Sequence, residues 1–283
     1  MSNKSGFVSF LYGNAVGRLM LKVIMGLHMD RIATKFLWSS LSHPVIGWYA
    51  GKNNIPLTKE EKEGFKTFRD FFVRTRETEG IDKTQSHFIS PCDGWLSAFN
   101  ITDDSCFDIK NSHYRVSDFL KDEELAANYK DGLLLVFRLC ASDYHHYCYI
   151  DDGYQGKNHV VPGVLHSVQP IACEKYPVYV LNKRSWCLLT TEHFGPVVQC
   201  EIGALVVGGI FNEKENARFC KGSEKGHFEL AGSTIVLLIE KGKVKLTREI
   251  TEKLKHSEEV RVLMGQHVGD AVGEVNDVAF DEE

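Results

Sequence analysis

The sequence predicts an α+β protein, with a helical N-terminal region over residues 1–78 and a mostly antiparallel, β-rich domain over residues 79–283. Apolar and aromatic residues recur at helical spacing through roughly the first 75 positions. From about Ile89 onward, short apolar runs alternate with Gly, Pro, Asn and Asp, which is the pattern of strands joined by turns. A chain of 283 residues with 43% hydrophobic content can also bury a large core.

The bulk composition excludes several classes of function. A formal net charge of −5 gives no basic surface for nucleic acid. The 8 cysteines are scattered without a CxxC pair, which suits a reducing compartment better than a disulfide framework or a structural zinc site. Neither a GxxxxGKS loop nor a GxGxxG turn is present, so nucleotide-dependent chemistry is not indicated.

The first apolar segment, residues 7–29, is interrupted by Arg18 and Lys22. Its uncharged run, residues 5–17, is shorter than the about 20 residues that a membrane-spanning helix requires. As a helix, the segment would gather apolar residues on one face and the two cations on another. Such a helix fits either a membrane interface with anionic headgroups or packing against the protein's own core. The apolar face would consist of Val16, Leu19, Met20, Val23, Ile24 and Leu27.

A second helical signal follows the break at residues 51–56. Thr58 and Glu61 have the spacing of a capping box, which opens a helix by satisfying its first backbone N–H groups. Aromatic residues then recur at helical spacing, and this is more simply explained by a core-facing surface than by a ligand site. These residues are Phe65, Phe68, Phe71 and Phe72.

Polar groups with catalytic potential stand at two strand ends in the β-rich domain. A turn that contains Asp93 precedes the expected strand Trp95–Phe99, and the buried strand Leu133–Leu139 leads toward His145 and His146. Paired histidines are candidates for acid–base catalysis or for metal binding. Zinc would need another ligand pair at suitable spacing, and the sequence shows none, so we expect no metal.

The triplet Gly232-Ser233-Thr234 precedes the apolar run Ile235–Ile239 and admits two interpretations. One is a tight turn into a core strand. The other is backbone chemistry, because glycine leaves its carbonyl unhindered and the next serine hydroxyl is an internal nucleophile. Other expected elements are strands at Val164–Val168, Val178–Leu181, Trp186–Thr190, Val197–Val207 and Val244–Leu246, and a helix near Thr247–His256.

Taken in order, the motifs resemble those of the pyruvoyl-dependent phosphatidylserine decarboxylases over nearly the whole chain. Each motif is weak alone, but their number and order make a strong signal. They are Thr67–Arg74, Ser90–Gly94, Arg138-Leu139, Asp143-Tyr144-His145, Asn182-Lys183-Arg184, Thr191–Gly195, Ile202-Gly203-Ala204 with Val207-Gly208, Lys221–Glu224 with Gly226 and Phe228, Gly232-Ser233-Thr234, and Val262–Gln266.

The resemblance implies a self-processing proenzyme. The Ser233 hydroxyl would attack the Gly232 carbonyl to give an ester, and β-elimination would divide the chain into fragments 1–232 and 233–283. Ser233 would become a covalent pyruvoyl group, which forms a Schiff base with the substrate amine and serves as electron sink. The cofactor would therefore be pyruvate made from the protein itself, with neither pyridoxal phosphate nor a metal.

The resemblance also assigns roles to polar residues and exposes a departure. Asp93 matches the aspartate that orients a histidine, and His145 matches a histidine that acts on the substrate or transfers protons. The family's second histidine, which activates the serine, falls on Cys148. Three explanations stay open: His146 takes over as base, Cys148 itself acts as base, or the chain processes slowly or not at all.

The resulting functional hypothesis is decarboxylation of phosphatidylserine to phosphatidylethanolamine and CO2. The enzyme would lie peripherally on the cytoplasmic side of the cell membrane. Its partners would be the phospholipid, its own two fragments and, as an option, a second copy in a homodimer. One alternative is a pyruvoyl-dependent decarboxylase of a soluble, perhaps aromatic, amino acid, for which Cys148 and Ala231 leave room. The other is an unprocessed, non-catalytic binding protein, against which the intact Gly232-Ser233-Thr234 argues.

Overall fold

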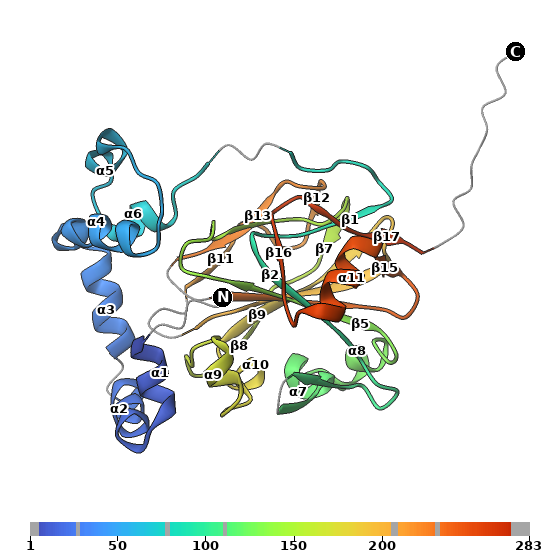
Figure 1. The fold of residues 1–283 in the computed structure, drawn as a ribbon. Helices are drawn as coiled ribbons and strands as arrows, with labels where there is room; N and C mark the ends of the chain where they lie inside the picture. The colour runs from blue at the N-terminus through green and yellow to red at the C-terminus, as the bar shows by residue number, and fades with distance from the viewer. Residues whose placement is uncertain are drawn as a thin grey trace, which may run out of the picture.

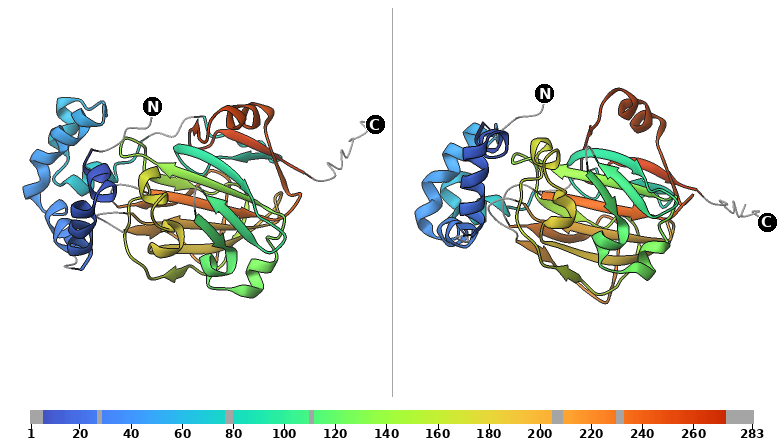
Figure 2. Two further views of the ribbon diagram at one scale, coloured as in Figure 1. Left: turned by 60° about the horizontal axis from the view of Figure 1, so that its bottom comes forward. Right: turned by 90° about the horizontal axis from the view of Figure 1, so that it is seen from below.

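The computed structural model describes residues 6–26, 29–76, 80–109, 112–204, 209–229 and 233–272. Its N-terminal helices form a layer along one side of a β-rich body (Figures 1 and 2). We call these helices and the residues up to Arg76 the helical arm. The arm contains α1 (Gly6–Gly13), α2 (Ala15–Gly26), α3 (Met29–Leu37), the 3-10 helix η1 (Ser40–Ser42), α4 (His43–Lys52), α5 (Lys59–Gly64) and α6 (Phe68–Phe72).

A large antiparallel sheet forms the centre of the body. Its strands lie side by side in the order β12 (Ala217–Phe219), β7 (Gly153–Gln155), β9 (Arg184–Thr191), β10 (Pro196–Ile202), β14 (Ser233–Ile239), β5 (Leu133–Leu139), β2 (Gly94–Asn100) and β16 (Val260–Val262), and β8 (His159–Val161) also pairs with β9. The strand that begins at Ser233 therefore lies in the middle of the sheet.

Smaller elements cover the two faces of this sheet. One small sheet has the order β11 (Ile210–Asn212), β13 (Glu224–Phe228), β6 (His146–Cys148), and another has β1 (His87–Ile89), β17 (His267–Ala271), β15 (Val244–Leu246). A hairpin is formed by β3 (Cys106–Ile109) and β4 (Ser112–Arg115). The helices of the body are α7 (Val116–Leu120), α8 (Glu123–Ala127), α9 (Pro170–Cys173), α10 (Val178–Leu181) and α11 (Arg248–His256).

The α+β prediction is confirmed, and so are most of the expected elements. Leu133–Leu139 is a strand, and Ile235–Ile239 lies in a strand whose residues are all buried. The capping box of α5 is present, because Thr58 Oγ1 accepts from the Glu61 N–H and Glu61 Oε2 accepts from the Thr58 N–H. The division at residues 78 and 79 stays a prediction, since residues 77–79 lie outside the described part.

Two expected strands were wrong. Val164–Val168 makes only an isolated bridge, between Val164 and Asn182, and Val178–Leu181 is the short helix α10. The guanidinium of Arg184 donates to the Val180 carbonyl at 2.8 Å and to the Phe119 carbonyl at 2.8 Å. These bonds satisfy backbone groups that a strand would have paired in a ladder. The contact to Phe119 is long-range, so local apolar periodicity could not reveal it.

The core has two parts because side chains alternate across the central sheet. Along β14, Val236 and Leu238 pack toward α7–α10, whereas Ile235, Leu237 and Ile239 pack toward the small sheets. The strand is thus buried on both faces. Its edges are buried too, since it pairs with β10 on one side and with β5 on the other.

A fully buried ion pair fastens β13 to the central sheet. Lys225 Nζ lies 2.8 Å from Glu201 Oε1 and 2.9 Å from Asn212 Oδ1, and both members of the pair are inaccessible to solvent. Glu201 also accepts from Gln199 Nε2 and Asn212 Nδ2. Although burial opposes it, the neighbouring Cys187 and Glu201 raise the pKa of Lys225 to about 12.

We expect Lys225→Met to destabilise the protein, because Glu201 would be left as a buried charge without its cation. Breaking such a pair costs about 3–5 kcal/mol. The double variant Lys225→Met/Glu201→Leu should recover most of this loss, since apolar replacement of both partners removes the unpaired charge. Urea unfolding of the two variants and the wild type measures the difference. A Lys225→Met variant as stable as the wild type would contradict the assignment.

Candidate active site

Ser233 is the first residue of β14, opposite Leu139 of β5. Its side chain is buried, and its Oγ has no hydrogen-bond partner among the described residues. Buried hydroxyls are normally paired, so an orphaned one requires an explanation. Gly232 and the two residues before it lie outside the described part of the chain, and its predicted role as the cleavage site stays a prediction.

Asp93 lies at the same end of the sheet as Ser233. It precedes β2, whose Trp95 pairs with Arg138 of β5, so Asp93 and Ser233 flank the end of β5 from opposite sides. The buried carboxylate accepts hydrogen bonds from Arg76 at 2.9 Å and from the Met264 N–H at 3.0 Å. Both of these donors reach Oδ1, and among the described contacts Asp93 has none with a histidine, so its role in orienting one stays a prediction.

His145 is buried against the arm, with its ring centroid 4.3 Å from that of Phe72. Burial lowers its pKa to about 3, against the opposing effect of a hydrogen bond to the Asp143 backbone. The imidazole is therefore neutral at physiological pH, and its Nε2 has no partner among the described residues. The His145 carbonyl accepts from the Phe228 N–H at 2.9 Å, which places His145 beside the end of β13, the strand that leads to Ser233.

His146 is held by acceptors at both ring nitrogens. Nδ1 lies 2.5 Å from Glu224 Oε1, and Nε2 lies 3.0 Å from the Val73 carbonyl oxygen. A histidine between two acceptors satisfies both only when both nitrogens carry protons. Its ring is also stacked between those of Tyr144 and His227, at centroid distances of 4.6 Å and 4.9 Å. These contacts do not support His146 as the base for Ser233.

Cys148 occupies the position of the missing histidine. It is buried beside the turn before β2: its N–H donates to the Pro91 carbonyl at 2.8 Å, and its Sγ lies 3.9 Å from the Ser90 carbonyl oxygen. Burial raises the pKa of the thiol to about 12. A thiol must lose its proton to act as base or nucleophile, so this environment does not support Cys148 as the base either.

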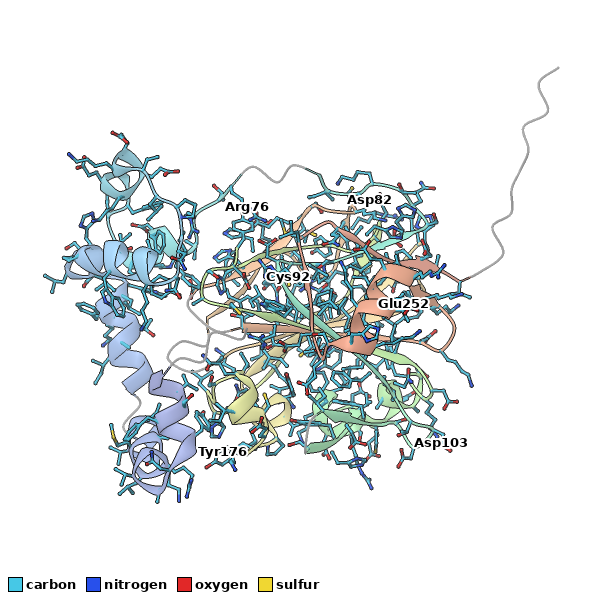
Figure 3. The ribbon with its side chains drawn as sticks, viewed as in Figure 1. Arg76, Asp82, Cys92, Asp103, Tyr176 and Glu252 are labelled. Carbon is cyan, nitrogen blue, oxygen red and sulfur yellow. The ribbon has the colours of Figure 1, made fainter. Side chains whose placement is uncertain are left out.

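Four residues around the site were not predicted from the sequence to belong to it. Phe72 packs on His145, Arg76 pairs with Asp93, and Glu224 and His227 contact His146. Figure 3 shows Arg76 where the chain leaves the arm, beside the body. Glu224 belongs to a motif that carried the family resemblance, but only the pairing of β13 with β6 reveals its partner.

Several buried polar atoms near the chain break predicted at residues 232 and 233 lack partners within the described part of the chain. They are His145 Nε2, His227 Nε2, Ser233 Oγ and Thr234 Oγ1. They come from the segment after β5, from β13 and from β14. Unpaired buried groups are costly, so each of these atoms requires an explanation.

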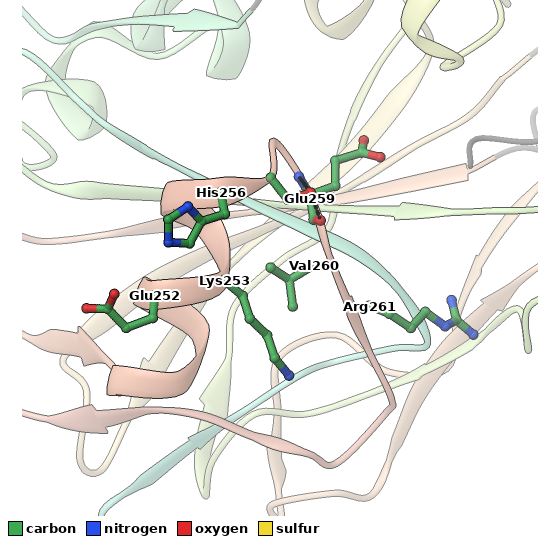
Figure 4. A pocket seen from close by; sticks show the side chains of 7 residues that line it. Glu252, Lys253, His256, Glu259, Val260 and Arg261 are labelled. Carbon is green, nitrogen blue, oxygen red and sulfur yellow. Dashed lines mark hydrogen bonds between the residues drawn. The ribbon is translucent and has the colours of Figure 1, made fainter.

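A hollow in the described part of the chain lies elsewhere, between α11 and β16 (Figure 4). It has a volume of about 530 Å³ and is lined by charged side chains, including Lys253 and Glu259. None of the predicted catalytic residues lines it. Arg261 in its wall reaches Asp143 at 2.9 Å, so it supports the back of the site from outside. We do not assign catalysis to this hollow.

Comparison with known proteins identifies the class to which this arrangement belongs. A family model described as phosphatidylserine decarboxylase matches residues 68–270. A relative from Clostridium acetobutylicum, named phosphatidylserine decarboxylase proenzyme 2, is 40% identical over 271 residues, which cover 94% of this chain and 92% of the relative. Phosphatidylserine decarboxylase proenzymes from Clostridium botulinum strain Eklund 17B and Ruminiclostridium cellulolyticum are each 35% identical, with 94% and 93% of this chain and 93% and 90% of the relatives covered.

The chain belongs to the phosphatidylserine decarboxylase family. The match spans the end of the arm and nearly all of the described body, and it includes Asp93, His145, Cys148 and Ser233. The resemblance inferred from the ordered motifs is thereby confirmed.

Proposed function

We propose that this chain is a carboxy-lyase proenzyme. It cleaves itself between Gly232 and Ser233, and the mature enzyme converts phosphatidylserine to phosphatidylethanolamine and CO2. The observation that carries the proposal is Ser233: a buried hydroxyl without a described partner, at the first residue of the central strand, in a chain whose relatives are named proenzymes. A serine in an ordinary turn would be exposed or hydrogen-bonded.

Breaking the chain uses only groups of the protein, and forming the pyruvoyl group also consumes one water molecule. The Ser233 oxygen attacks the Gly232 carbonyl, the peptide C–N bond breaks, and an ester forms. Removal of the Ser233 α proton then breaks the bond between Cβ and the ester oxygen, which releases Gly232 as a carboxylate and leaves dehydroalanine at position 233. Water replaces the nitrogen of dehydroalanine, ammonia leaves, and a pyruvoyl group remains.

We assign proton transfer to His145. Its Nε2 has no described partner, and burial, which lowers its pKa, keeps the ring unprotonated, so the Nε2 lone pair is open to a proton although the ring is a weaker base than a free imidazole. His146 is engaged at both nitrogens and Cys148 is a buried thiol, so His145 is the group best prepared among these three. Burial against Phe72 keeps water from competing for the ring.

The residues present fit a pyruvoyl group derived from Ser233. The position is buried and its polar atom has no described partner. A keto group there would supply an electron sink for the electron pair left on the α carbon of an amine substrate when CO2 departs. The buried Leu139, opposite Ser233 on β5, helps to exclude solvent from this position. His145 can then return a proton to the carbon that has lost CO2.

The two fragments are expected to stay together after cleavage. Fragment 233–283 begins with β14, which pairs with β10 and β5 of the larger fragment along its whole length. Withdrawing β14 would expose large side chains such as Ile235, Leu237 and Ile239 to water. Each costs about 1.5–3 kcal/mol to expose, before the lost backbone hydrogen bonds are counted.

The arm offers an apolar surface for a membrane. On α2, Gly17 and Leu21 are buried. Of the predicted apolar face, Val16, Leu19, Met20 and Val23 are exposed, and the side chains of Ile24 and Leu27 lie outside the described part. Of the helices in the described part of the chain, none combines the length and apolar character needed to cross a bilayer. Exposed apolar side chains on such helices fit an interfacial contact with a membrane. In the described part of the arm, the large exposed apolar residues are Phe10, Val16, Leu19, Met20, Val23, Ile32, Phe36, Trp38, Leu41 and Trp48.

The arm also contacts the candidate site. Phe72 packs on His145, the Val73 carbonyl contacts His146, and Arg69 pairs with Glu229 at 2.9 Å. A lipid substrate held at the arm surface is therefore close to the residues that would act on it. We place the enzyme peripherally on the cytoplasmic side of the cell membrane.

We expect Leu41→Glu/Trp48→Glu to weaken membrane binding by at least about tenfold, because two exposed apolar side chains (75% and 63% exposed) become charged. Co-sedimentation with phosphatidylserine-containing vesicles measures the bound fraction. The matched control is Val160→Glu, an equally exposed position on the body. Equal loss in the control, or no sedimentation of the wild type, would contradict the assignment of the arm surface.

Substrate class is tested directly with purified, processed protein. CO2 release is compared for phosphatidylserine in mixed micelles, free serine and free aromatic amino acids. The lipid should be turned over and the free amino acids should not. Turnover of a free amino acid alone would contradict the lipid assignment and favour the soluble alternative. The self-cleavage proposal is tested separately, by the masses of the two fragments.

A further inference from the structure

Three metal-ligating side chains converge where β6 pairs with β13. His146 and His227 are directly opposite each other in this pair, and their rings stack at a centroid distance of 4.9 Å. Glu224 Oε1 lies 2.5 Å from Nδ1 of His146 and 4.0 Å from Nδ1 of His227. One ligand atom from each residue lies within 4.8 Å of the other two. The sequence spacing did not predict this group, because strand pairing creates it.

The outer contact of His146 resembles that of a metal ligand. Its Nε2 faces the Val73 carbonyl, which can only accept, so this nitrogen carries a proton. Metal-bound histidines commonly donate their second N–H to a backbone carbonyl in this way, which fixes the ring and leaves the other nitrogen for the metal. The other nitrogen, Nδ1, points at a carboxylate oxygen. Two acceptors this close require a cation between them, either a proton or a metal ion.

The site is also accessible and incomplete. The Glu224 side chain is 37% exposed and His227 is 14% exposed, whereas His146 is only 5% exposed, so an ion can enter past Glu224. His227 Nε2 is buried without a partner in the described part of the chain, so no hydrogen bond at that nitrogen opposes a small rotation of the ring. Two imidazoles and one carboxylate are a donor set suited to zinc, with a fourth position left for water.

We propose that His146, Glu224 and His227 form a Zn²⁺ site beside the catalytic centre. The ion replaces the proton between His146 and Glu224, and these two atoms separate to roughly the 3.3 Å that ligands at 2.0–2.1 Å require in a tetrahedral site. Bound zinc joins β6 to β13, the strand that leads to the cleavage position. The ion is a ligand of the protein and takes no part in the decarboxylation, so the proposal does not rest on the proposed function.

The test is zinc titration of the chelator-treated full chain, by calorimetry and by thermal unfolding, in a Cys220→Ser background that removes the exposed thiol. We expect one Zn²⁺ per chain and a raised Tm. His227→Gln and Glu224→Gln should each weaken zinc binding by more than the roughly 10-fold that losing an outer partner costs. Each variant's zinc-free Tm and circular dichroism show whether it is folded.

The matched control is His267→Gln, which disrupts the other group in the described part of the chain that could hold a metal ion, Asp82, His87 and His267. It should bind zinc as the parent does. Absence of zinc binding to the parent overturns the proposal, because a proton then occupies the space between His146 and Glu224. Loss of binding in His267→Gln with retention in both site variants also overturns it.

Discussion

The Ser233→Ala variant is expected to remain a single chain of 32.0 kDa and to release no CO2 from phosphatidylserine. Alanine lacks the oxygen that must attack the Gly232 carbonyl, so neither the ester nor the pyruvoyl group can form. The change removes one buried hydroxyl that has no described hydrogen-bond partner, so the fold should be unaffected. Denaturing gels and an activity assay on the same preparation measure both effects.

The matched control is Ser223→Ala, a serine ten residues earlier that directly precedes β13. Among the described contacts, the Ser223 Oγ donates only to the Cys220 carbonyl, at 2.6 Å. The Ser223→Ala variant should therefore cleave itself and decarboxylate the substrate as the wild type does. Decarboxylation by uncut Ser233→Ala would show that the chemistry does not depend on position 233. Cleavage of Ser233→Ala at the same bond would show that the Ser233 hydroxyl is not the nucleophile that breaks the chain.

His145→Gln is expected to slow self-cleavage and to lower decarboxylation by about 10²–10⁴-fold, the range typical for loss of a proton-transferring group. Glutamine retains a polar side chain of similar reach but cannot exchange protons near neutral pH. Separating the cleaved fraction before the assay distinguishes a defect in maturation from a defect in turnover.

His146→Gln supplies the comparison. If His145 is the base, His146→Gln still cleaves itself, because the ring it replaces is engaged by Glu224 and the Val73 carbonyl. If His146→Gln stays uncut while His145→Gln matures normally, the assignment must be exchanged between the two residues. Cys148→Ser should also mature, since the buried thiol is not the base in this account.

Much of the fold could be predicted from local sequence patterns. Ile235–Ile239 reads as a buried strand because it is apolar throughout, and Thr58 and Glu61 specify a capping box by spacing alone. α10 was misread as a strand because its short apolar run has no period that separates the two states. The Arg184 guanidinium favours the helix, and it donates to backbone carbonyls of α7 that lie more than 60 positions away in the sequence.

The site divides in the same way. Ser233, Asp93 and His145 were found because ordered motifs mark them. The contacts that decide their chemistry could not be found, because they join distant segments: Arg76 with Asp93, Phe72 with His145, and Glu224 with His146. The buried state of Cys148, which weighs against a thiolate, likewise depends on the turn before β2 and not on its neighbours in sequence.

The arm shows why surface and core cannot be separated by periodicity. The same helical face of α2 fits a membrane or a protein core, and only the packing of Gly17 and Leu21 on its opposite side leaves Val16, Leu19 and Met20 exposed. Tyr12 of α1 anchors the arm to the body, donating or accepting at His166 Nδ1 across 3.1 Å and accepting from the Ser167 N–H at 2.9 Å. The apolar surface is therefore presented by a docked arm.

The central claim is that this chain makes its own cofactor at Ser233, and the intact mass of the purified wild-type protein tests it most directly. The account predicts two associated fragments, 1–232 and 233–283. The smaller should be lighter than a serine-started peptide by one ammonia, resist N-terminal sequencing and take up a carbonyl reagent such as hydroxylamine. A single uncut chain of 32.0 kDa, or a smaller fragment that begins with a free serine amine, would contradict it.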